Sequence, residues 1–552
     1  MVRGQEIVVV DMGEKIPAIS GSPSHCEHAA FTESRAVENF EELKYVRQGL
    51  KQRHIQMIAL AGTIGTGLFL GLGQALAKAG PLGTFLGYSI TGSVACAVVM
   101  AVGEMGALLP LSGGYVRYSE YFFDRSASFA QGWNMVYSYL VAIPAELVAA
   151  AVLVEFWSSL NPAVWITVFG SIMLISTLVF VRVYGELEFA FALLKIALII
   201  GINILALVIT CGGGPSGESI GFRYWREPGP FVQFLGIPGA TGRFAGFWTT
   251  FTNALYAYAS IESISLAAAE TRHPRRAIPM AAKRIFARVL LFYVLTIFMV
   301  GLVVPSNDPD LLHSNGNASQ SPFVIAARRA GIKVVPSIIN AVVLTSAWSA
   351  GNSGLLGGSR VLYGLALHEN APQIFRRVNR FGIPYVAVGL FGLFMGLGYM
   401  TLSRSASVVF GWLLDLVAIA TLVNWIIITT TFLRLFYAMK KQNIDRHDRL
   451  PWASPFQPYL SWYALAMQLL ILLTGGYTTF IKGHWDAEVF VAAYLNVPLV
   501  LVLYFGHKFV MKTKIIPLAE VQIADLLAIY EAHPEPPAVR KKGLARLNFL
   551  WG

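Results

Sequence analysis

About twelve apolar stretches, each near the roughly 20 residues that a membrane-spanning helix needs, follow one another along this chain. Hydrophobic residues make up 55% of its 552 residues and charged residues only 13%, which excludes a soluble globular protein. The expected spans are 54–76, 82–109, 129–157, 163–181, 188–210, 244–268, 283–304, 334–364, 383–402, 408–436, 459–480 and 488–510. The sequence therefore predicts an all-α polytopic membrane protein.

Lys and Arg residues predict the orientation, because short cytoplasmic loops carry an excess of them. The densest cluster falls between the sixth and seventh expected spans, and consists of Arg272, Arg275, Arg276, Lys283 and Arg284. An even number of spans puts both termini on one side of the membrane, and this cluster assigns that side to the cytoplasm. The predicted organisation is a cytoplasmic tail at 1–45, a twelve-helix domain at 46–510 and a second cytoplasmic tail at 511–552.

Several function classes find no support in the composition. The net charge of +11 is explained by loop topology and by attraction to an anionic leaflet, and a nucleic-acid partner would need a basic soluble domain that is missing. Three cysteines, Cys26, Cys96 and Cys211, form no metal-ligand cluster or disulfide framework. No catalytic constellation is present, so we expect no enzyme activity, no metal and no cofactor.

Three glycines within six residues, Gly62, Gly65 and Gly67, interrupt the first expected span. Unravelled backbone in hydrocarbon leaves polar groups unpaired at several kcal/mol each, so it persists only beside protein or water. Secondary transporters use such broken helices as binding sites, where half-helix amides face anionic groups. The alternative is close helix packing through small residues, which the glycines alone leave open.

Three ionisable residues fall well inside expected spans: Glu146 in the third, Lys195 in the fifth and Glu262 in the sixth. A charge at the bilayer centre costs at least ~2.5 kcal/mol and is normally retained for function. We therefore predict that these residues carry a coupled proton. Alternatively, Glu146 and Lys195 merely satisfy each other as a structural pair. Glu104 and Asp415 lie near helix ends and are weaker candidates.

Polar and aromatic side chains in the same spans predict a partly polar cavity between spans one, three, six, eight and ten. The polar members are Ser138, Thr249, Thr252, Asn253, Ser260, Asn352, Ser353 and Asn424. The aromatic members are Tyr137, Tyr139, Tyr256, Tyr258 and Trp425. For the aromatic residues, ordinary packing or an interfacial belt is the alternative.

Many blocks of the sequence resemble fungal amino-acid permeases, the yeast-type branch of the amino acid, polyamine and organocation transporter superfamily. The similarity covers about residues 44–520 and is specific because unrelated blocks agree in order. The blocks include Gly62-Thr63-Ile64-Gly65-Thr66-Gly67, Gly103-Glu104-Met105, Glu270-Thr271-Arg272-His273-Pro274 and Ser349-Ala350-Gly351-Asn352-Ser353.

The resemblance implies a LeuT-like fold of two inverted five-helix repeats, with helices one and six broken and two helices added. It implies that backbone amides of the first break hold the substrate α-carboxylate, at Thr63, Ile64, Gly65, Thr66 and Gly67. Carbonyls of the sixth-helix break would meet the α-amino group, at Tyr256, Ala257, Tyr258, Ala259 and Ser260. Ser138 and Asn424 match positions that influence selectivity. Lys195 matches a lysine that bacterial proton-coupled relatives use in coupling.

Three positions depart from the family pattern, and one of them is Leu356, which replaces a common aromatic after Asn352-Ser353. Ser260 stands where the sixth-helix break usually has glycine, so its backbone is expected to be less free. Asn424 stands where serine or threonine is usual, which adds an amide with both a donor and an acceptor. These departures bear on the choice of substrate and leave the class unchanged.

The sequence thus predicts a plasma-membrane importer that takes up amino acids by proton symport, with neutral amino acids favoured and the proton gradient as driving force. Its expected partners are a small amino acid, protons, the lipid bilayer, and trafficking and ubiquitination machinery on the cytoplasmic tails. Two alternatives remain open. One is transport of acidic or basic amino acids, GABA or polyamines, and the other is an amino-acid sensor that keeps the fold but transports nothing.

Overall fold

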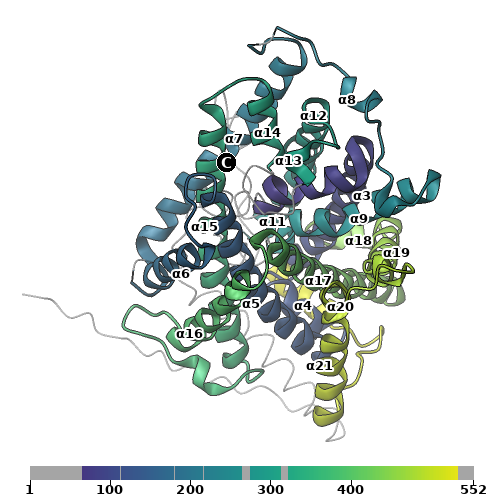
Figure 1. Ribbon diagram of the computed structural model, residues 1–552. Helices are drawn as coiled ribbons and strands as arrows, with labels where there is room; N and C mark the ends of the chain where they lie inside the picture. Colours follow the sequence, from purple (N-terminus) through teal and green to yellow (C-terminus); the bar gives the residue numbers. More distant parts are fainter. Residues whose placement is uncertain are drawn as a thin grey trace, which may run out of the picture. The chain divides into compact units, whose positions relative to one another are not determined.

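The structure is a computed structural model that describes residues 65–111, 113–179, 181–215, 217–263, 274–312 and 321–532, with the backbone alone at 181–186. Throughout this part of the chain the regular structure is helical, in α, 3₁₀ and π forms (Figure 1). The predicted all-α fold class is therefore confirmed.

The helices follow the expected spans closely, with short helices in the connecting loops. The first half contains η1 (Gly67–Gly71), α3 (Leu72–Leu108), α4 (Tyr115–Phe122), α5 (Arg125–Val154), α6 (Pro162–Val179), α7 (Val181–Thr210), α8 (Arg223–Arg226), η2 (Phe234–Gly236), α9 (Gly239–Ala257) and η3 (Ile261–Ser263). The middle contains α11 (Pro274–Arg288), η4 (Val289–Val294), α12 (Leu295–Val303), α13 (Pro309–Leu312), α14 (Pro322–Arg329) and α15 (Val335–Leu367). The last part contains η6 (Gln373–Arg376), α16 (Tyr385–Phe394), η7 (Met395–Leu402), α17 (Ala406–Lys441), α18 (Arg446–Arg449), α19 (Tyr459–Thr474), η8 (Tyr477–Phe480), α20 (Ala487–Tyr494), α21 (Asn496–Met511) and α22 (Ile523–Ala532).

Eight helical stretches among the described residues are long and apolar enough to cross a membrane. They are Gly67–Leu108, Arg125–Val154, Pro162–Val179, Leu187–Thr210, Pro274–Val303, Tyr385–Leu402, Ala406–Lys441 and Ala487–Met511. Three further helices, α9, α15 and α19, fall on the expected sixth, eighth and eleventh spans. The first of the eight stretches covers part of the first expected span and all but the last residue of the second.

The first and second spans meet at a kink inside α3. Gly80 has φ 79° and ψ 173°, a conformation that L side chains rarely adopt, and Pro81 follows it. The connection before α9 fastens this kink, because the Leu82 amide donates to the Pro230 carbonyl at 3.0 Å and the Val232 amide donates to the Ala79 carbonyl at 3.3 Å. The boundary predicted between residues 76 and 82 therefore coincides with a real break.

The sixth span is broken, as the family resemblance implies. Helix α9 ends at Ala257, a turn covers residues 258–260, and η3 resumes at Ile261. Ser260 has φ 68°, a left-handed conformation in which a residue with a Cβ is strained by about 1–2 kcal/mol. The serine thus keeps the backbone shape that glycine would adopt freely.

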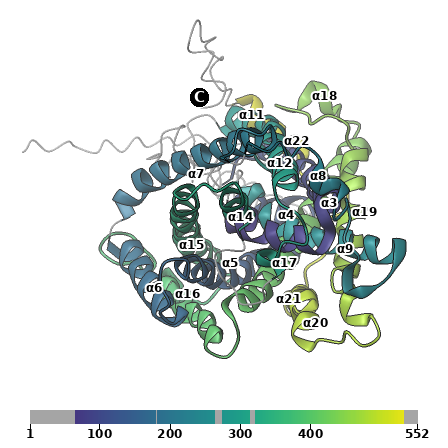
Figure 2. The ribbon, with the colours of Figure 1, turned by 45° about the horizontal axis from the view of Figure 1, so that its top comes forward.

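Helix α5 lies at the centre of the packing. It contacts α15, α17 and α21, while α3 packs against α9 and α11 (Figure 2). These contacts bring the first, third, sixth, eighth and tenth spans into one neighbourhood, where the sequence predicts a cavity.

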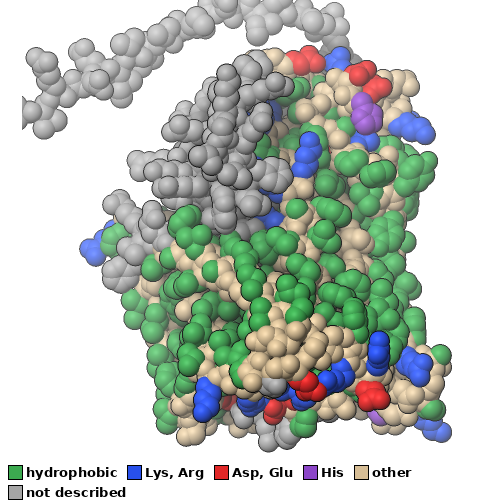
Figure 3. Space-filling view, turned by 90° about the horizontal axis from the view of Figure 1, so that it is seen from above, with side chains coloured by type: hydrophobic (Ala, Val, Ile, Leu, Met, Phe, Trp, Pro, Cys, Tyr) green, Lys and Arg blue, Asp and Glu red, His purple; other side chains and the backbone are tan. Residues whose placement is uncertain are grey.

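The face drawn in Figure 3 presents an apolar band between two rims that carry charged side chains. Helix α6 has an apolar outer face of its own, because its exposed and buried residues alternate with a helical period. Its exposed residues include Val164, Val168, Ile172, Ile175 and Val179. Its buried residues are Ile166, Gly170, Met173 and Thr177. Such a face is suited to lipid, which agrees with a multi-pass membrane protein.

Candidate functional site

The described end of the glycine cluster in the first span, Gly65 to Gly67, lies against the sixth-helix break, and we call this contact the junction. A Cβ added at Gly67 would stand 2.7 Å from Cδ1 of Tyr256 and 2.8 Å from Cα of Ala257, so only glycine fits this approach. At Gly65 the nearest atom to such a Cβ is Oε1 of Glu146, at 3.8 Å. Gly67 therefore serves close packing, the alternative stated above, while the predicted break of the first span stays a prediction. The predicted site residues Thr63 and Ile64 lie outside the described residues.

Three polar side chains from three elements meet at this junction. The Thr66 hydroxyl donates to Oε1 of Glu146 at 3.0 Å, and the Tyr256 hydroxyl donates to the same oxygen at 3.1 Å. The two hydroxyl oxygens lie 3.3 Å apart. Thr66 is the residue before η1, Glu146 comes from α5 and Tyr256 from α9. The glutamate thus ties the third span to the first span at Thr66 and to the residues before the sixth-helix break at Tyr256.

The second carboxylate oxygen of Glu146 has no such support. Oε2 is buried and has no hydrogen-bond partner among the described residues, and the whole residue is only 8% exposed. A buried acceptor without a hydrogen bond costs about 1–3 kcal/mol of stability, and more when it is charged. This oxygen is therefore suited to receive a proton or a donor group from a ligand.

Tyrosines support the backbone of the sixth-helix break. The Tyr293 hydroxyl donates to the Ala257 carbonyl at 3.1 Å, and the Tyr258 hydroxyl donates to the Tyr88 carbonyl at 3.1 Å. The Tyr258 and Tyr293 rings pack with centroids 4.6 Å apart. The Tyr258 side chain is thus engaged in holding the break. Each carbonyl oxygen has two lone pairs, so Ala257 can accept one further bond.

Lys195 lies in a second buried group, between α7 and α15. Its Nζ donates to Oγ of Ser349 at 3.3 Å, and Ser349 in turn donates to Oε2 of Glu188 at 2.6 Å. Lys195 is 1% exposed and Glu188 2%. The lysine also interacts electrostatically with Glu146, which links the two groups. The roles of Glu146 and Lys195 in proton coupling stay a prediction.

Glu188 is a buried acid that the sequence reasoning missed. It is the first residue of the expected fifth span, where a carboxylate is easily assigned to the interface. The signal that could have found it is its spacing from Lys195, since residues seven apart share one face of a helix.

Glu262 lies in a different environment from Glu146. Its Oε2 accepts a hydrogen bond from Nε1 of Trp425 at 3.0 Å, and it interacts electrostatically with Tyr115 and Tyr139. These partners come from α17, α4 and α5. The Trp425 hydrogen bond thus fastens η3 to α17, and the role of Glu262 in coupling stays a prediction.

The two positions predicted to set selectivity differ in their surroundings. Asn424 on α17 is 2% exposed, and its Oδ1 has no hydrogen-bond partner among the described residues. Ser138 on α5 is half-buried and lies eight residues before Glu146, roughly 12 Å along the helix. At Ser260 and Ala259 the chain is exposed and half-buried respectively. Contact of these residues with a substrate stays a prediction.

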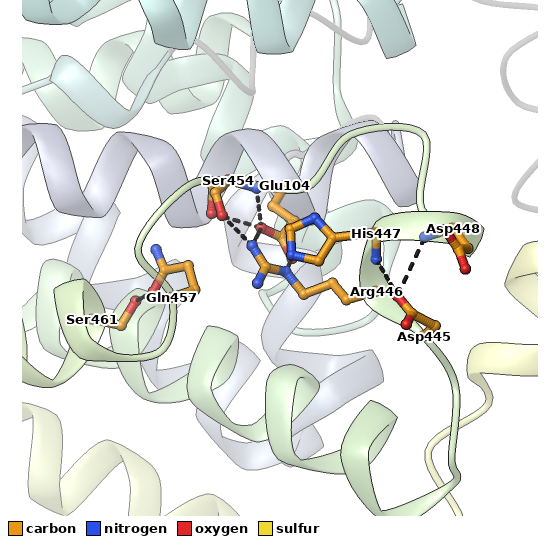
Figure 4. A network of polar contacts seen from close by, with 8 residues as sticks. All are labelled: Glu104, Asp445, Arg446, His447, Asp448, Ser454, Gln457 and Ser461. Carbon is orange, nitrogen blue, oxygen red and sulfur yellow. Dashed lines mark hydrogen bonds and ion pairs between the residues drawn. The ribbon is translucent and has the colours of Figure 1, made fainter.

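Glu104, a weaker candidate, is fully engaged in a structural contact (Figure 4). Arg446 donates from Nε to Oε1 at 2.6 Å and from Nη2 to Oε2 at 3.2 Å. The Ser454 amide and hydroxyl donate to Oε2 at 2.7 and 2.6 Å, and Arg446 also donates to the Ser454 carbonyl. The segment between α17 and α19 is thereby fastened to the end of α3.

Comparison with known proteins assigns the family of this chain. The family model described as amino acid permease matches residues 54–518. The chain is 41% identical over 454 residues to a probable proline-specific permease, put4, of Schizosaccharomyces pombe, which covers 81% of this chain and 82% of that protein. It is 38% identical over 491 residues to a proline-specific permease of Saccharomyces cerevisiae, with 87% and 78% covered. It is 34% identical over 541 residues to a dicarboxylic amino acid permease of the same yeast, with 97% and 89% covered.

Proposed function

This chain belongs to the amino-acid permease family, and from that premise we propose that it imports neutral amino acids across the plasma membrane by proton symport. The family and the apolar helices make it a multi-pass membrane transporter rather than an enzyme. The relatives' names span proline and dicarboxylic amino acids, so the choice of substrate has to be argued from the site.

The junction supports an amino acid as the ligand. Amides at the start of a helix have no partner within the helix and suit a carboxylate, while carbonyls of an interrupted helix suit an ammonium group. An acidic side chain would add a negative charge beside Glu146, which is unfavourable in a low dielectric. A basic amino acid is the runner-up, because its side-chain cation would pair with Glu146.

One observation carries the proton coupling: Glu146 is buried at the junction, held only by hydroxyls, with Oε2 free of partners among the described residues. Protonation removes the cost of this buried charge and gives the carboxyl a donor. Proton binding and release by Glu146 can then accompany substrate movement, with Lys195 close enough to influence the charge electrostatically.

The same side of the molecule holds the basic loops and the chain's C-terminal part, which supports cytoplasmic termini. Arg275, from the densest basic cluster, lies over the Tyr530 ring of α22 at 4.9 Å. Arg449, after α17, forms an ion pair with Glu531 at 3.2 Å. Since short basic loops favour the cytoplasm, α22 is assigned there as well.

Uptake of radiolabelled amino acids by permease-deficient yeast cells tests this function. We expect accumulation of neutral amino acids that rises with external acidity and collapses with a protonophore. Competition by unlabelled acidic and basic amino acids, GABA and polyamines ranks the alternatives. Uptake that ignores both pH and protonophore would contradict symport, and surface-expressed protein with no uptake of any compound would favour a sensor.

A substitution at the junction tests the placement of the site. Gly67→Ala puts a methyl group 2.8 Å from the Ala257 backbone, so it should abolish uptake of every substrate. Gly71→Ala is the matched control, since its Cβ would meet only Leu414 Cδ1 at an ordinary 3.5 Å. Strong polyamine uptake that survives Gly67→Ala would contradict the assignment of this junction to an amino acid.

A further inference from the structure

Glu188 is a second buried carboxylate near the proposed coupling residues, and the transport proposal does not use it. It lies on α7, seven residues before Lys195, which places the two residues on one face about 10.5 Å apart along the axis. Only 2% of Glu188 is exposed. A buried acid in a spanning helix is costly and needs a reason.

Ser349 on α15 bridges the two residues. It accepts from Nζ of Lys195 at 3.3 Å and donates to Oε2 of Glu188 at 2.6 Å. A hydroxyl has one proton to donate and two lone pairs, so both bonds form at once when lysine is charged and glutamate is ionised. These two hydrogen bonds are therefore consistent with a charged Lys195 that is linked to an ionised Glu188 through the Ser349 hydroxyl. Among the described residues, the titratable groups that interact electrostatically with Lys195 are Glu188 on its own helix and Glu146 on α5.

The charges of Glu146, Glu188 and Lys195 determine how many protons this buried group must bind to become neutral. With Glu146 and Glu188 ionised and Lys195 charged, the net charge is −1, and a single proton makes the group neutral. Net charge buried at membrane depth is expensive, whereas a balanced group is less so. The proton is directed to Glu146, because its Oε2 has no partner among the described residues while Glu188 accepts from Ser349.

We propose that Glu188 is a positioning residue which, through Ser349, keeps Lys195 charged and so makes Glu146 require one proton for each substrate carried. This inference rests on the proton symport proposed above and names a residue and a stoichiometry for it. The competing explanation is that Glu188 and Ser349 only fasten α7 to α15.

The two explanations predict different transport behaviour for the Glu188→Gln variant. The amide keeps the side chain's shape, but Glu146 and Lys195 then balance each other without an added proton. Substrate should still cross the membrane, yet it should no longer be concentrated by a proton gradient. A purely structural role predicts that exchange and accumulation decline together.

The experiment uses the full chain, purified and reconstituted in liposomes, with the membrane potential held at zero by potassium and valinomycin. Counterflow exchange of a labelled amino acid reports translocation without a gradient. Accumulation under a gradient of one pH unit reports coupling, and one proton per substrate sustains about tenfold accumulation. The variants are Glu188→Gln, Ser349→Ala and, as a control for the same chemical change at a half-buried carboxylate at the end of α5, Glu155→Gln.

We expect wild type and Glu155→Gln to accumulate about tenfold. Glu188→Gln should keep counterflow while its accumulation ratio falls to about one, and Ser349→Ala should shift in the same direction by less. Full accumulation by Glu188→Gln, or parallel loss of both activities, would overturn the role of Glu188. If Glu188→Gln does not fold, Ser349→Ala decides by the same criteria. Wild-type protein that exchanges but never accumulates would overturn proton symport itself, and the Glu188 role with it.

Discussion

Glu104 and Glu146 are both buried glutamates in neighbouring spans, yet their surroundings differ in kind. Glu104, 1% exposed, receives two bonds from Arg446 and two from Ser454. Glu146, 8% exposed, receives two bonds on one oxygen from Thr66 and Tyr256, and its other oxygen has no partner among the described residues. One carboxylate is satisfied by a cation and an amide, and the other only by neutral hydroxyls.

The difference teaches that partners, rather than burial, separate a structural acid from a candidate proton carrier. A guanidinium and a backbone amide can only donate, and both oxygens of Glu104 accept from such fixed donors. Hydroxyls can donate to a carboxylate or accept from a carboxylic acid, so the Thr66 and Tyr256 contacts survive either state of Glu146. Substitutions at Glu104, Glu146 and Asp124 test this contrast, and one at Ser260 tests the backbone of the sixth-helix break.

The largest effect is expected at the satisfied glutamate. Glu104→Gln leaves the Arg446 guanidinium, whose side chain is 10% exposed, buried without a counter-charge. Breaking a buried pair in this way costs about 3–5 kcal/mol. Thermal unfolding of the purified protein in detergent should show a large loss of stability, while the molecules that remain folded keep proton-driven uptake. Glu488→Gln, at the exposed pair with Arg404, is the control and should change stability by less than about 1 kcal/mol.

Glu146→Gln should show the opposite pattern. Removing a buried charge that has an unsatisfied oxygen should leave thermal stability near that of wild type, while gradient-driven accumulation falls about tenfold per pH unit of gradient, equivalent to about 1.4 kcal/mol. Uptake with and without a protonophore, normalised to surface protein, measures this. A strong loss of stability with coupling intact would place Glu146 in the same class as Glu104.

Asp124 offers an intermediate case outside the spanning segments. Burial acts to raise the pKa of this carboxyl, but bonds from Lys508 at 2.5 Å and from the Ser126 amide at 3.0 Å outweigh it and hold the pKa below its ordinary value of 3.8. A carboxyl whose pKa is lower in the folded than in the unfolded protein stabilises the fold. This stabilisation is fully present at a pH above the unfolded-state pKa, and it is lost as the pH falls through the folded-state pKa. Asp124→Asn should therefore cost about 1–2 kcal/mol at pH 7.

The pH dependence of the stability lost in Asp124→Asn tests whether the charge of Asp124 is the cause. The difference in unfolding temperature between wild type and Asp124→Asn should stay constant from pH 7 to pH 5 and shrink only below about pH 4. A difference that persists undiminished at still lower pH would show that charge is not its source.

The smallest effect concerns the strained serine of the sixth-helix break. Ser260→Gly should relieve its left-handed backbone, φ 68°, and stabilise the protein by up to about 1 kcal/mol after glycine's added chain entropy is counted. Ser260→Ala removes the hydroxyl and keeps the strain, so its unfolding temperature should not rise. Equal stabilisation by both variants would contradict backbone strain as the cause.

Much of the fold could be predicted because its signals are local. Apolar runs of about 20 residues locate the spans. The site was predicted only in part. The resemblance implied that the first-span glycines and the sixth-helix break face each other, and Gly67 does contact Tyr256 and Ala257. The sequence did not indicate that Thr66 and Tyr256 share one oxygen of Glu146, or that Ser349 links Lys195 to Glu188.

These contacts were inaccessible because they join distant parts of the chain. Ser349 is separated from Glu188 by 161 positions, and Ser454 from Glu104 by 350. Glu104 and Glu146 look alike in sequence, since each is an acid in an apolar run. No local pattern reports whether an arginine from a remote loop will reach one of them.

The sequence by itself determined that this chain is a multi-pass membrane protein, and it located the helices, because transfer of apolar segments into lipid depends on short stretches alone. The break of the sixth helix followed from the resemblance to a known family. Only the tertiary structure decided the environment of each buried acid. A carboxylate's charge state depends on the donors within a few ångströms, and packing of α3, α5, α7, α15 and α17 selects those donors.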